Sequence, residues 1–180
     1  MKKLILTVAL GLATSFGAFA QGQFNLANGA PGVDAPISDA SGALLADTGF
    51  WIQAYTAAGA GQAEGSLTAL GSPFRAATGV AGYFFPGATA VPGSASGEVV
   101  TVQIRAWSDN VTSYEAAIAT PLSEAGMSNA IDITLAGGTT PLNDMVGLTS
   151  FQLSVVPVPE PSVIMLGIAG AGLLWFRRKK

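Results

Sequence analysis

Apolar and polar residues alternate along several stretches of this chain. In segment 100–107 Val100, Val102, Ile104 and Ala106 face one way, whereas Thr101, Gln103, Arg105 and Trp107 face the other. Alternation with period two predicts half-buried β-strands. The same pattern occurs at 50–55, 131–135 and 151–155, with shorter candidate strands at 23–27, 67–70 and 79–85.

Turn-forming residues separate these segments, and one stretch has helical features. Gly and Pro cluster at 29–32, 86–87 and 137–138, which is typical of turns. Connections 57–66 and 88–97 are rich in Gly, Ala and Ser, so we expect mobile loops there. Segment 113–119 predicts a short helix, because Ser113 suits the N-cap position and Glu115 the first turn.

About seven short strands and one helix predict an all-β fold, an antiparallel β-sandwich, over residues 21–156. Such a body is large enough to have a hydrophobic core of its own. We expect two further segments outside it. Residues 1–20 predict an N-terminal signal helix, and residues 157–180 a tail with a membrane helix.

The first twenty residues have the order of a secretory signal. Lys2 and Lys3 precede an apolar run at 4–12, and Ala18 and Ala20 form a small-x-small cleavage site. We therefore expect export, with cleavage after Ala20. The alternative is an ordinary amphipathic or core helix, which the basic, apolar, Ala-x-Ala order disfavours.

The last residues predict a second targeting segment. Alternating prolines at 157, 159 and 161 favour an extended, polyproline-like chain. The run 163–176 has no charge, and it ends at Arg177, Arg178, Lys179 and Lys180. As a helix this run rises about 21 Å, which is short of a ~30 Å hydrocarbon core. Its apolar character on all sides and the basic cluster nevertheless favour a membrane-engaging helix over a buried core helix.

This tail resembles the PEP-CTERM sorting signal of exported proteins in Gram-negative bacteria, usually ones that make exopolysaccharide. The resemblance covers only residues 158–180. It implies that Pro159, Glu160 and Pro161 form the motif recognised by an exosortase-type membrane protease. It also implies that 163–176 is a transient inner-membrane anchor and that 177–180 is the stop-transfer cluster. The protease would then release or transfer the body to the cell surface or the medium.

Composition excludes several kinds of chemistry. The chain has no Cys and no His, so thiol and imidazole catalysis and the common transition-metal ligands are missing. Between Gln21 and Glu160 two arginines face eleven carboxylates, which gives a formal charge of −9. An acidic body is not attracted to phosphate backbones, so nucleic acid is excluded as a partner. We expect no cofactor and no resident metal.

Carboxylates are the remaining candidates for chemistry. A glycosidase needs only two of them at a suitable separation, and the candidates are Asp109, Glu115, Glu124, Asp132 and Asp144. Calcium also takes carboxylate oxygens, and Asp34, Asp39, Asp47 and Asp109 lie in or near loops. No D-x-D-x-D-G loop is present, and solvated surface acids explain both sets more simply.

Three aromatic residues suggest a binding surface. Trp51 and Tyr55 share one strand face, and Trp107 lies on the polar face of 100–107. If these strands are neighbours, the three rings form a platform suited to sugar rings. The alternative is that the rings cover the core, as large aromatics in β-proteins usually do.

The sequence therefore supports three functional hypotheses. The first is a non-enzymatic, exported protein of the cell surface or extracellular matrix, sorted by its C-terminal signal. The second is a carbohydrate-binding module that uses Trp51, Tyr55 and Trp107 to bind exopolysaccharide. The third is a carboxylate-dependent glycosidase. Burial of the rings distinguishes the first two hypotheses, and the spacing of the carboxylates tests the third.

Overall fold

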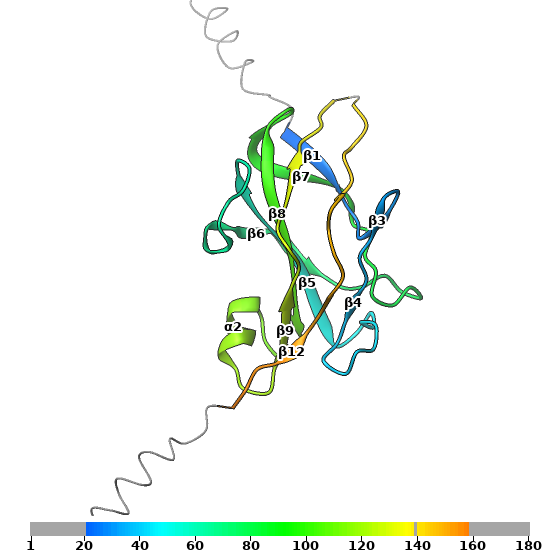
Figure 1. The fold of residues 1–180 in the computed structure, drawn as a ribbon, viewed down its shortest axis with the longest axis vertical. Helices are drawn as coiled ribbons and strands as arrows, with labels where there is room; N and C mark the ends of the chain where they lie inside the picture. The colour runs from blue at the N-terminus through cyan, green and yellow to red at the C-terminus, as the bar shows by residue number, and fades with distance from the viewer. Residues whose placement is uncertain (1–20, 139, 159–180) are drawn as a thin grey trace, which may run out of the picture.

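A computed structural model describes residues 21–138 and 140–158, and this part of the chain is all-β with one short α-helix (Figure 1). The predicted signal segment, the Pro-Glu-Pro motif, the apolar run and the basic cluster lie outside the described residues. The elements keep the labels of Figure 1. They are β1 (Gln21–Leu26), β2 (Gly29–Ala30), β3 (Val33–Asp34), β4 (Ile37–Ser38), β5 (Phe50–Ala58), η2 (Glu64–Ser66), β6 (Thr68–Phe74), β7 (Gly87–Ala95), β8 (Val99–Ser108), α2 (Tyr114–Ala119), β9 (Glu124–Met127), β10 (Ile131–Thr134), β11 (Phe151–Gln152) and β12 (Ser154–Val155).

A six-stranded antiparallel sheet forms the centre of the fold. Its strand order is β12-β9-β8-β5-β6, and β10 also pairs with β8. Strands β5 and β8 pair along their whole length, with Trp51 opposite Trp107 and Ala58 opposite Val100. Strands β9 and β10 follow one another along the other edge of β8. These long pairings make β8 the central strand.

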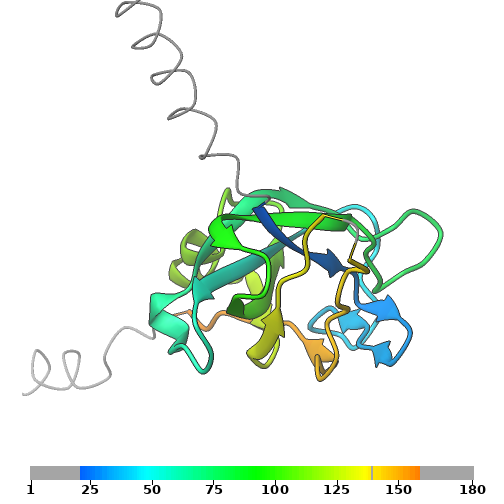
Figure 2. The ribbon, with the colours of Figure 1, turned by 90° about the horizontal axis from the view of Figure 1, so that it is seen from above.

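Three two-stranded sheets complete the body. β1 pairs with β7 and β2 with β3, both antiparallel, whereas β4 and β11 are parallel. α2 lies on one side of β5 and β8, and β3 and β4 lie on the other (Figures 1 and 2). The pairing is therefore antiparallel everywhere in these sheets except at β4 and β11.

The main core lies between one face of the large sheet and the small sheets. The large sheet contributes the apolar residues that alternation predicted, Val100, Val102, Ile104 and Ala106 among them. They pack with Phe24 and Leu26 of β1, Val33 of β3, Ile37 of β4 and Val91 of β7. The inward face of 100–107 is thus confirmed.

The predicted strands at 50–55, 100–107 and 131–135 and the helix at 113–119 are confirmed. The Ser113 hydroxyl accepts a hydrogen bond from the Ala116 N–H, as expected of an N-cap. The shorter candidates 23–27 and 67–70 correspond to β1 and β6, while 151–155 is interrupted at Leu153 between β11 and β12. The interruption lies where the segment changes its partner, since Phe151 and Gln152 pair with β4 whereas Ser154 and Val155 pair with β9.

Two expectations about local structure were wrong. Segment 79–85 is a turn-rich loop, because the buried Asn28 side chain donates to Gly82 O (2.9 Å) and accepts from Phe84 N–H (2.7 Å). Segment 88–97, expected to be a loop, instead contains most of β7, whose backbone pairs with β1. Its small side chains gave no apolar alternation from which a strand was predictable.

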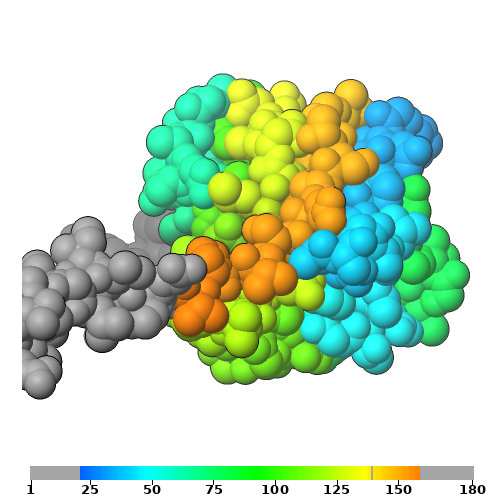
Figure 3. Space-filling model, turned by 60° about the horizontal axis from the view of Figure 1, so that its bottom comes forward, coloured from blue at the N-terminus to red at the C-terminus, as the bar shows by residue number. Residues whose placement is uncertain are grey.

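The two ends of the described chain lie at opposite ends of the body (Figure 1). β1 begins at Gln21 beside Ala95 at one end, and β12 pairs with β9 at the other. Residues up to 158, orange in Figure 3, lie beside the yellow-green residues near α2 and β9. The chain therefore leaves the body at the α2 end.

Candidate functional site

The three predicted rings share one face of the large sheet. β5 and β8 are neighbours, Trp51 lies directly opposite Trp107, and Tyr55 lies opposite Gln103. Gln53 and Arg105 pair between them. The strand arrangement on which the platform hypothesis depended is therefore present.

This face is covered, however, so the rings do not form an open platform. The Trp107 side chain is fully buried, and Tyr55 is only 3% exposed. Tyr114 and Ala117 of α2, together with Leu67 and Ala125, pack on them in a second hydrophobic cluster. Trp51 is only partly buried and packs at the edge of this cluster. The alternative, that the rings cover a core, describes these residues correctly.

The same covering overturns the prediction that 100–107 is half-buried. Its polar residues are as inaccessible as its apolar ones, since every residue from Thr101 to Trp107 is buried. α2, the segment 59–67 and Ser128 after β9 supply the polar partners. Gln62 N–H donates to the Thr101 hydroxyl (3.0 Å), for example, and the Gln103 amide donates to Ser128 O (3.0 Å). The polar residues that alternate with apolar ones along β8 thus face a second, polar core rather than solvent.

Arg105 is the centre of this polar core. Its guanidinium lies 4.1 Å from the Tyr55 ring centroid and 5.0 Å from that of Tyr114. It donates to Gln103 Oε1 (3.0 Å) and to the Glu64 carbonyl (3.1 Å), and it lies 3.5 Å from Glu115 Oε1. A buried cation with aromatic faces and hydrogen-bond acceptors around it is satisfied by the protein itself. This geometry fits a structural role better than a ligand anchor.

Burial changes the acidity of two tyrosines next to Arg105. Desolvation, followed by the hydrogen bond from the Tyr55 hydroxyl to Glu115 (3.0 Å), raises the pKa of Tyr55 to about 12. Desolvation likewise raises the pKa of Tyr114. Both phenols therefore stay protonated at neutral pH and serve as packing and hydrogen-bonding groups.

Arg75 makes a second arginine–aromatic contact, at the surface. Its guanidinium lies 4.0 Å from the Trp51 ring centroid, and it forms a 3.1 Å ion pair with Asp109. Both side chains of the pair are about one third exposed. Water screens such a pair, so it contributes little to stability.

The five candidate catalytic carboxylates are each engaged by a different partner. Asp109 pairs with Arg75, and Glu115 contacts Arg105 and Tyr55. Glu124 accepts from Ala40 N–H, Asp132 from Gly61 N–H and Thr101, and Asp144 from Asn25. Within 21–138 and 140–158, no group of three or more acidic residues is arranged to hold a metal ion. The carboxylates thus act locally, as caps and cross-links.

The acids considered for calcium are also used locally. The Asp39 carboxylate accepts from the Ser41 hydroxyl and from the N–H groups of Ser41 and Ala43, and these bonds lower the pKa of Asp39. Asp34 accepts from the Tyr83 hydroxyl (2.6 Å). Asp47 lies in the segment before β5. Asp39 therefore organises its own turn.

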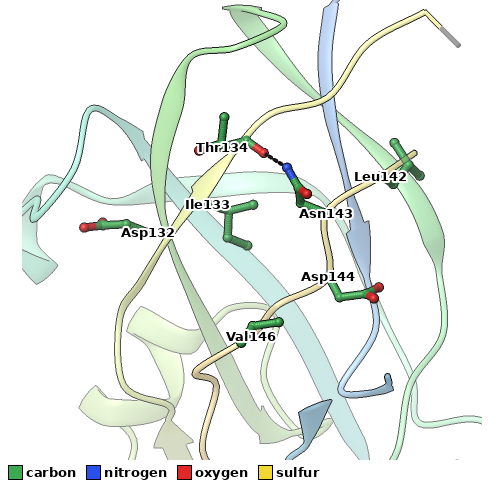
Figure 4. A pocket seen from close by; sticks show the side chains of 7 residues that line it. All are labelled: Asp132, Ile133, Thr134, Leu142, Asn143, Asp144 and Val146. Carbon is green, nitrogen blue, oxygen red and sulfur yellow. Dashed lines mark hydrogen bonds between the residues drawn. The ribbon is translucent and has the colours of Figure 1, made fainter. Parts of the chain in front are cut away.

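An open groove of about 440 Å³ runs beside β10 (Figure 4). Asp132, Thr134, Asn143, Asp144 and Val146 are among its lining residues. The Asn143 amide donates to the Thr134 carbonyl (2.7 Å) and so bridges the two walls. Figure 4 shows the Asp132 and Asp144 carboxylates pointing in opposite directions. This arrangement does not aim two carboxylates at one bond, as glycoside hydrolysis requires.

Sequence reasoning missed one exposed aromatic pair. Tyr83 and Phe85 are parallel, with an interplanar angle of 5° and 6.4 Å between ring centroids. Both rings lie against Gly29, where a Cβ would approach Tyr83 to 2.9 Å. Phe85 is about half exposed. The i, i+2 spacing of the two rings is visible in the sequence, within the segment 79–85 that is predicted as a short strand.

The predicted sorting residues lie outside the described part of the chain. They are Ala18, Ala20, Pro159, Glu160, Pro161, Arg177, Arg178, Lys179 and Lys180. Among the residues that the structure describes, no helix has the length and apolar character needed to cross a bilayer. The signal peptide and the membrane tail therefore remain predictions from sequence.

No protein-family model matches the chain, and comparison with curated proteins and with solved structures finds no match.

Proposed function

We propose that this protein is an exported, non-enzymatic component of the cell surface or extracellular matrix, sorted through its C-terminal tail. An exosortase-type membrane protease recognises Pro159, Glu160 and Pro161 while the apolar run 163–176 holds the chain in the inner membrane. The all-β body, which we infer to be a β-sandwich, is then released or transferred. Its role there is structural or adhesive.

The observation that supports this proposal most strongly is that the described strands form a body with its own core between the two predicted sorting segments. β1 begins at Gln21, directly after the predicted cleavage site, and pairs with β7. At the other end, Val156 makes the last backbone hydrogen bonds among the described residues, since it donates to Ser123 O and accepts from Leu122 N–H. Removal of both segments therefore leaves every described strand intact.

The non-enzymatic part of the proposal follows from the side chains of the body. The sequence provides no imidazole or thiol, and the five candidate carboxylates are each held by separate partners. The two arginines stack on aromatic rings. A stable scaffold with an acidic surface is the function that these features favour.

Alanine substitution of the sorting motif tests the proposal. Replacing Pro159, Glu160 and Pro161 with Ala should keep the protein in the membrane fraction of its native host, while the unaltered chain is released. Pro92→Ala and Pro141→Ala, at two exposed prolines of the body, serve as controls and should be released normally. Unchanged release of the triple variant would contradict the proposal.

One observation favours carbohydrate binding as a second candidate function. The parallel rings of the partly buried Tyr83 and the half-exposed Phe85, with Asp34 hydrogen-bonded to Tyr83, offer an apolar face and a polar group to a sugar. We expect glycan-array binding by the mature body to fall about tenfold in Phe85→Ala, but not in Leu44→Ala, a similarly exposed aliphatic control. No binding by the parent protein would end this hypothesis.

A further inference from the structure

Exposed apolar side chains are present at the end of the body from which the tail leaves. Leu122 is 71% exposed, and Ile118, Val155 and Val158 are each about half exposed. They belong to α2, to the turn after it, to β12 and to the last described residue, which lie at one end of the body (Figures 1 and 3). The Leu122 N–H donates to Val156 O (2.9 Å), which joins the turn to the exit strand. We call Ile118, Leu122, Val155 and Val158 the exit patch.

The backbone of Leu122 is held in an unfavourable conformation. With φ at +66°, Leu122 is the one residue other than glycine with a positive φ among those the structure describes. A left-handed conformation is costly for a leucine, whose Cβ crowds the following carbonyl. Hydrogen bonds from Ser123 N–H to Thr120 O and from Val156 N–H to Ser123 O hold the turn. Strain that presents a leucine to solvent indicates a contact outside the body.

The charges near the exit patch indicate an apolar partner. Of the two arginines in the described chain, Arg105 is buried, and Arg75 forms an ion pair with Asp109 and stacks on Trp51. The nearby carboxylates are occupied, because Glu115 contacts Arg105 and Tyr55, and Glu124 accepts from Ala40 N–H. Both arginines of the described body are thus engaged by other residues, and the exit patch is suited to insertion among lipid headgroups by its apolar side chains.

The length of the tail places the exit patch close to the membrane. Four residues, and so five residue-to-residue steps, separate Val158 from Val163, where the predicted membrane run begins. A polyproline-like chain spans about 3.1 Å per residue, so this linker reaches roughly 15 Å. While the tail is anchored, Val158 therefore stays within about this distance of the start of the run, and the rest of the exit patch lies at the same end of the body. The polar interfacial layer of a bilayer is itself several ångströms thick.

We propose that the exit patch rests on the lipid bilayer while the protein is anchored, with Leu122 inserted into the interface. This inference depends on the membrane tail of the proposed function. The contact fixes the orientation of the body, so that the β1–β7 end points away from the membrane. It also holds the Pro-Glu-Pro segment close to the bilayer surface, where a membrane-embedded protease acts.

Site-specific fluorescence in vesicles tests this contact. The chain has no native cysteine, so single labels with an environment-sensitive dye are introduced as Leu122→Cys, Ile118→Cys and, as a control, Ser96→Cys. Ser96 is exposed in the turn between β7 and β8, at the opposite end of the body (Figure 1). Full-length protein is reconstituted in phosphatidylethanolamine–phosphatidylglycerol vesicles, and nitroxide-labelled lipid is added as quencher.

The inference predicts at least threefold stronger lipid quenching at positions 118 and 122 than at 96. Flotation of the protein with the vesicles after a carbonate wash reports the anchor separately. Flotation with equal quenching at all positions would overturn the lipid contact and leave the anchor intact. Failure to float would contradict the proposed anchor and the contact together. A blue shift at 122 that lipid quencher does not affect would indicate a protein neighbour, such as a second copy, and would also overturn the lipid contact.

Discussion

At the scale of single residues, the two arginines of the body make the same contact in different surroundings. Each guanidinium stacks on an aromatic ring at 4.0–4.1 Å, Arg75 on Trp51 and Arg105 on Tyr55. Arg105 is buried and hydrogen-bonded to Gln103 and the Glu64 carbonyl, whereas Arg75 is partly exposed. We therefore expect the burial of each arginine, rather than its stacking distance, to determine how much that arginine contributes to the stability of the body.

We therefore expect Arg105→Met to destabilise the body by about 1–3 kcal/mol, because charge-assisted hydrogen bonds and a desolvated cation–π contact are lost. Arg75→Met should cost less than about 1 kcal/mol. Urea unfolding of both variants measures the difference. Equal losses in the two variants would show that Arg105 does not organise the polar core.

Tyr55 gives the polar core a pH dependence. Its pKa is raised to about 12 by burial and by the hydrogen bond to Glu115, while an unfolded tyrosine has a pKa of about 10. The folded state thus keeps a proton that the unfolded state loses. Its stabilising effect is fully present below about pH 10 and is lost as the pH rises towards about 12.

Tyr55→Phe should accordingly reduce the loss of stability between about pH 10 and pH 12. The slope should not vanish, because the pKa of Tyr114 is also raised. At neutral pH the variant should lose about 1 kcal/mol, the usual contribution of a hydrogen bond. Urea midpoints measured across this range test the prediction, and an unchanged slope would contradict it.

At the scale of elements, side-chain pattern made β5, β8, β10 and α2 predictable. β5 and β8 contain runs in which apolar and polar side chains alternate, and Ser113 marks the start of α2. β7 was not predictable, because its residues Gly87–Ala95 are small and include Pro92. β7 pairs with β1, the one strand hydrogen-bonded to it among the described residues, and a proline is tolerated on an edge strand. Backbone pairing, which the sequence does not display, defines this strand.

The covered aromatic face was unpredictable for a related reason. Alternation identified the face shared by Trp51, Tyr55 and Trp107, but not what packs on it. Leu67, which directly follows η2, and Tyr114 and Ala117 of α2 cover this face. Contacts between segments that are distant in the sequence leave no local pattern in it. Pattern therefore predicted which residues lie together and failed to predict their exposure.

Gly22 in β1 provides a test of how closely the two-stranded β1–β7 sheet packs against its neighbours. A Cβ on Gly22 would lie 2.6 Å from Ala95 O and 2.6 Å from Leu135 Cδ1. Gly22→Ala should therefore destabilise the body by about 1–3 kcal/mol, as overpacking usually does. Gly65→Ala is the matched control, because Gly65 in η2 has open space and no positive φ. We expect it to be neutral or slightly stabilising in thermal unfolding. A neutral Gly22→Ala would show that β1 does not pack tightly on β7.

At the scale of the whole molecule, charge and fold are separated along the chain. Six of the eight basic residues lie at 2–3 and 177–180, outside the described body, and the span from Gln21 to Glu160 has a formal charge of −9. Basic flanks favour retention on the cytoplasmic side of a membrane. The acidic body between them favours solubility after export.

The direction of the chain through the body supports the same account. β1 starts at one end, and the chain leaves at the other, next to the exit patch (Figure 1). Cleavage at the predicted sites removes no residue from a strand that the structure describes. Loss of both segments should therefore leave the stability of the body unchanged.

Intact-mass analysis of the protein from its native host tests the central claim most directly. We expect material in the medium or on the cell surface to begin at Gln21 and to lack the apolar run 163–176 and the basic cluster 177–180. Recovery of the full 180-residue chain from the cytosol, with Met1 and Lys180 in place, would contradict the account.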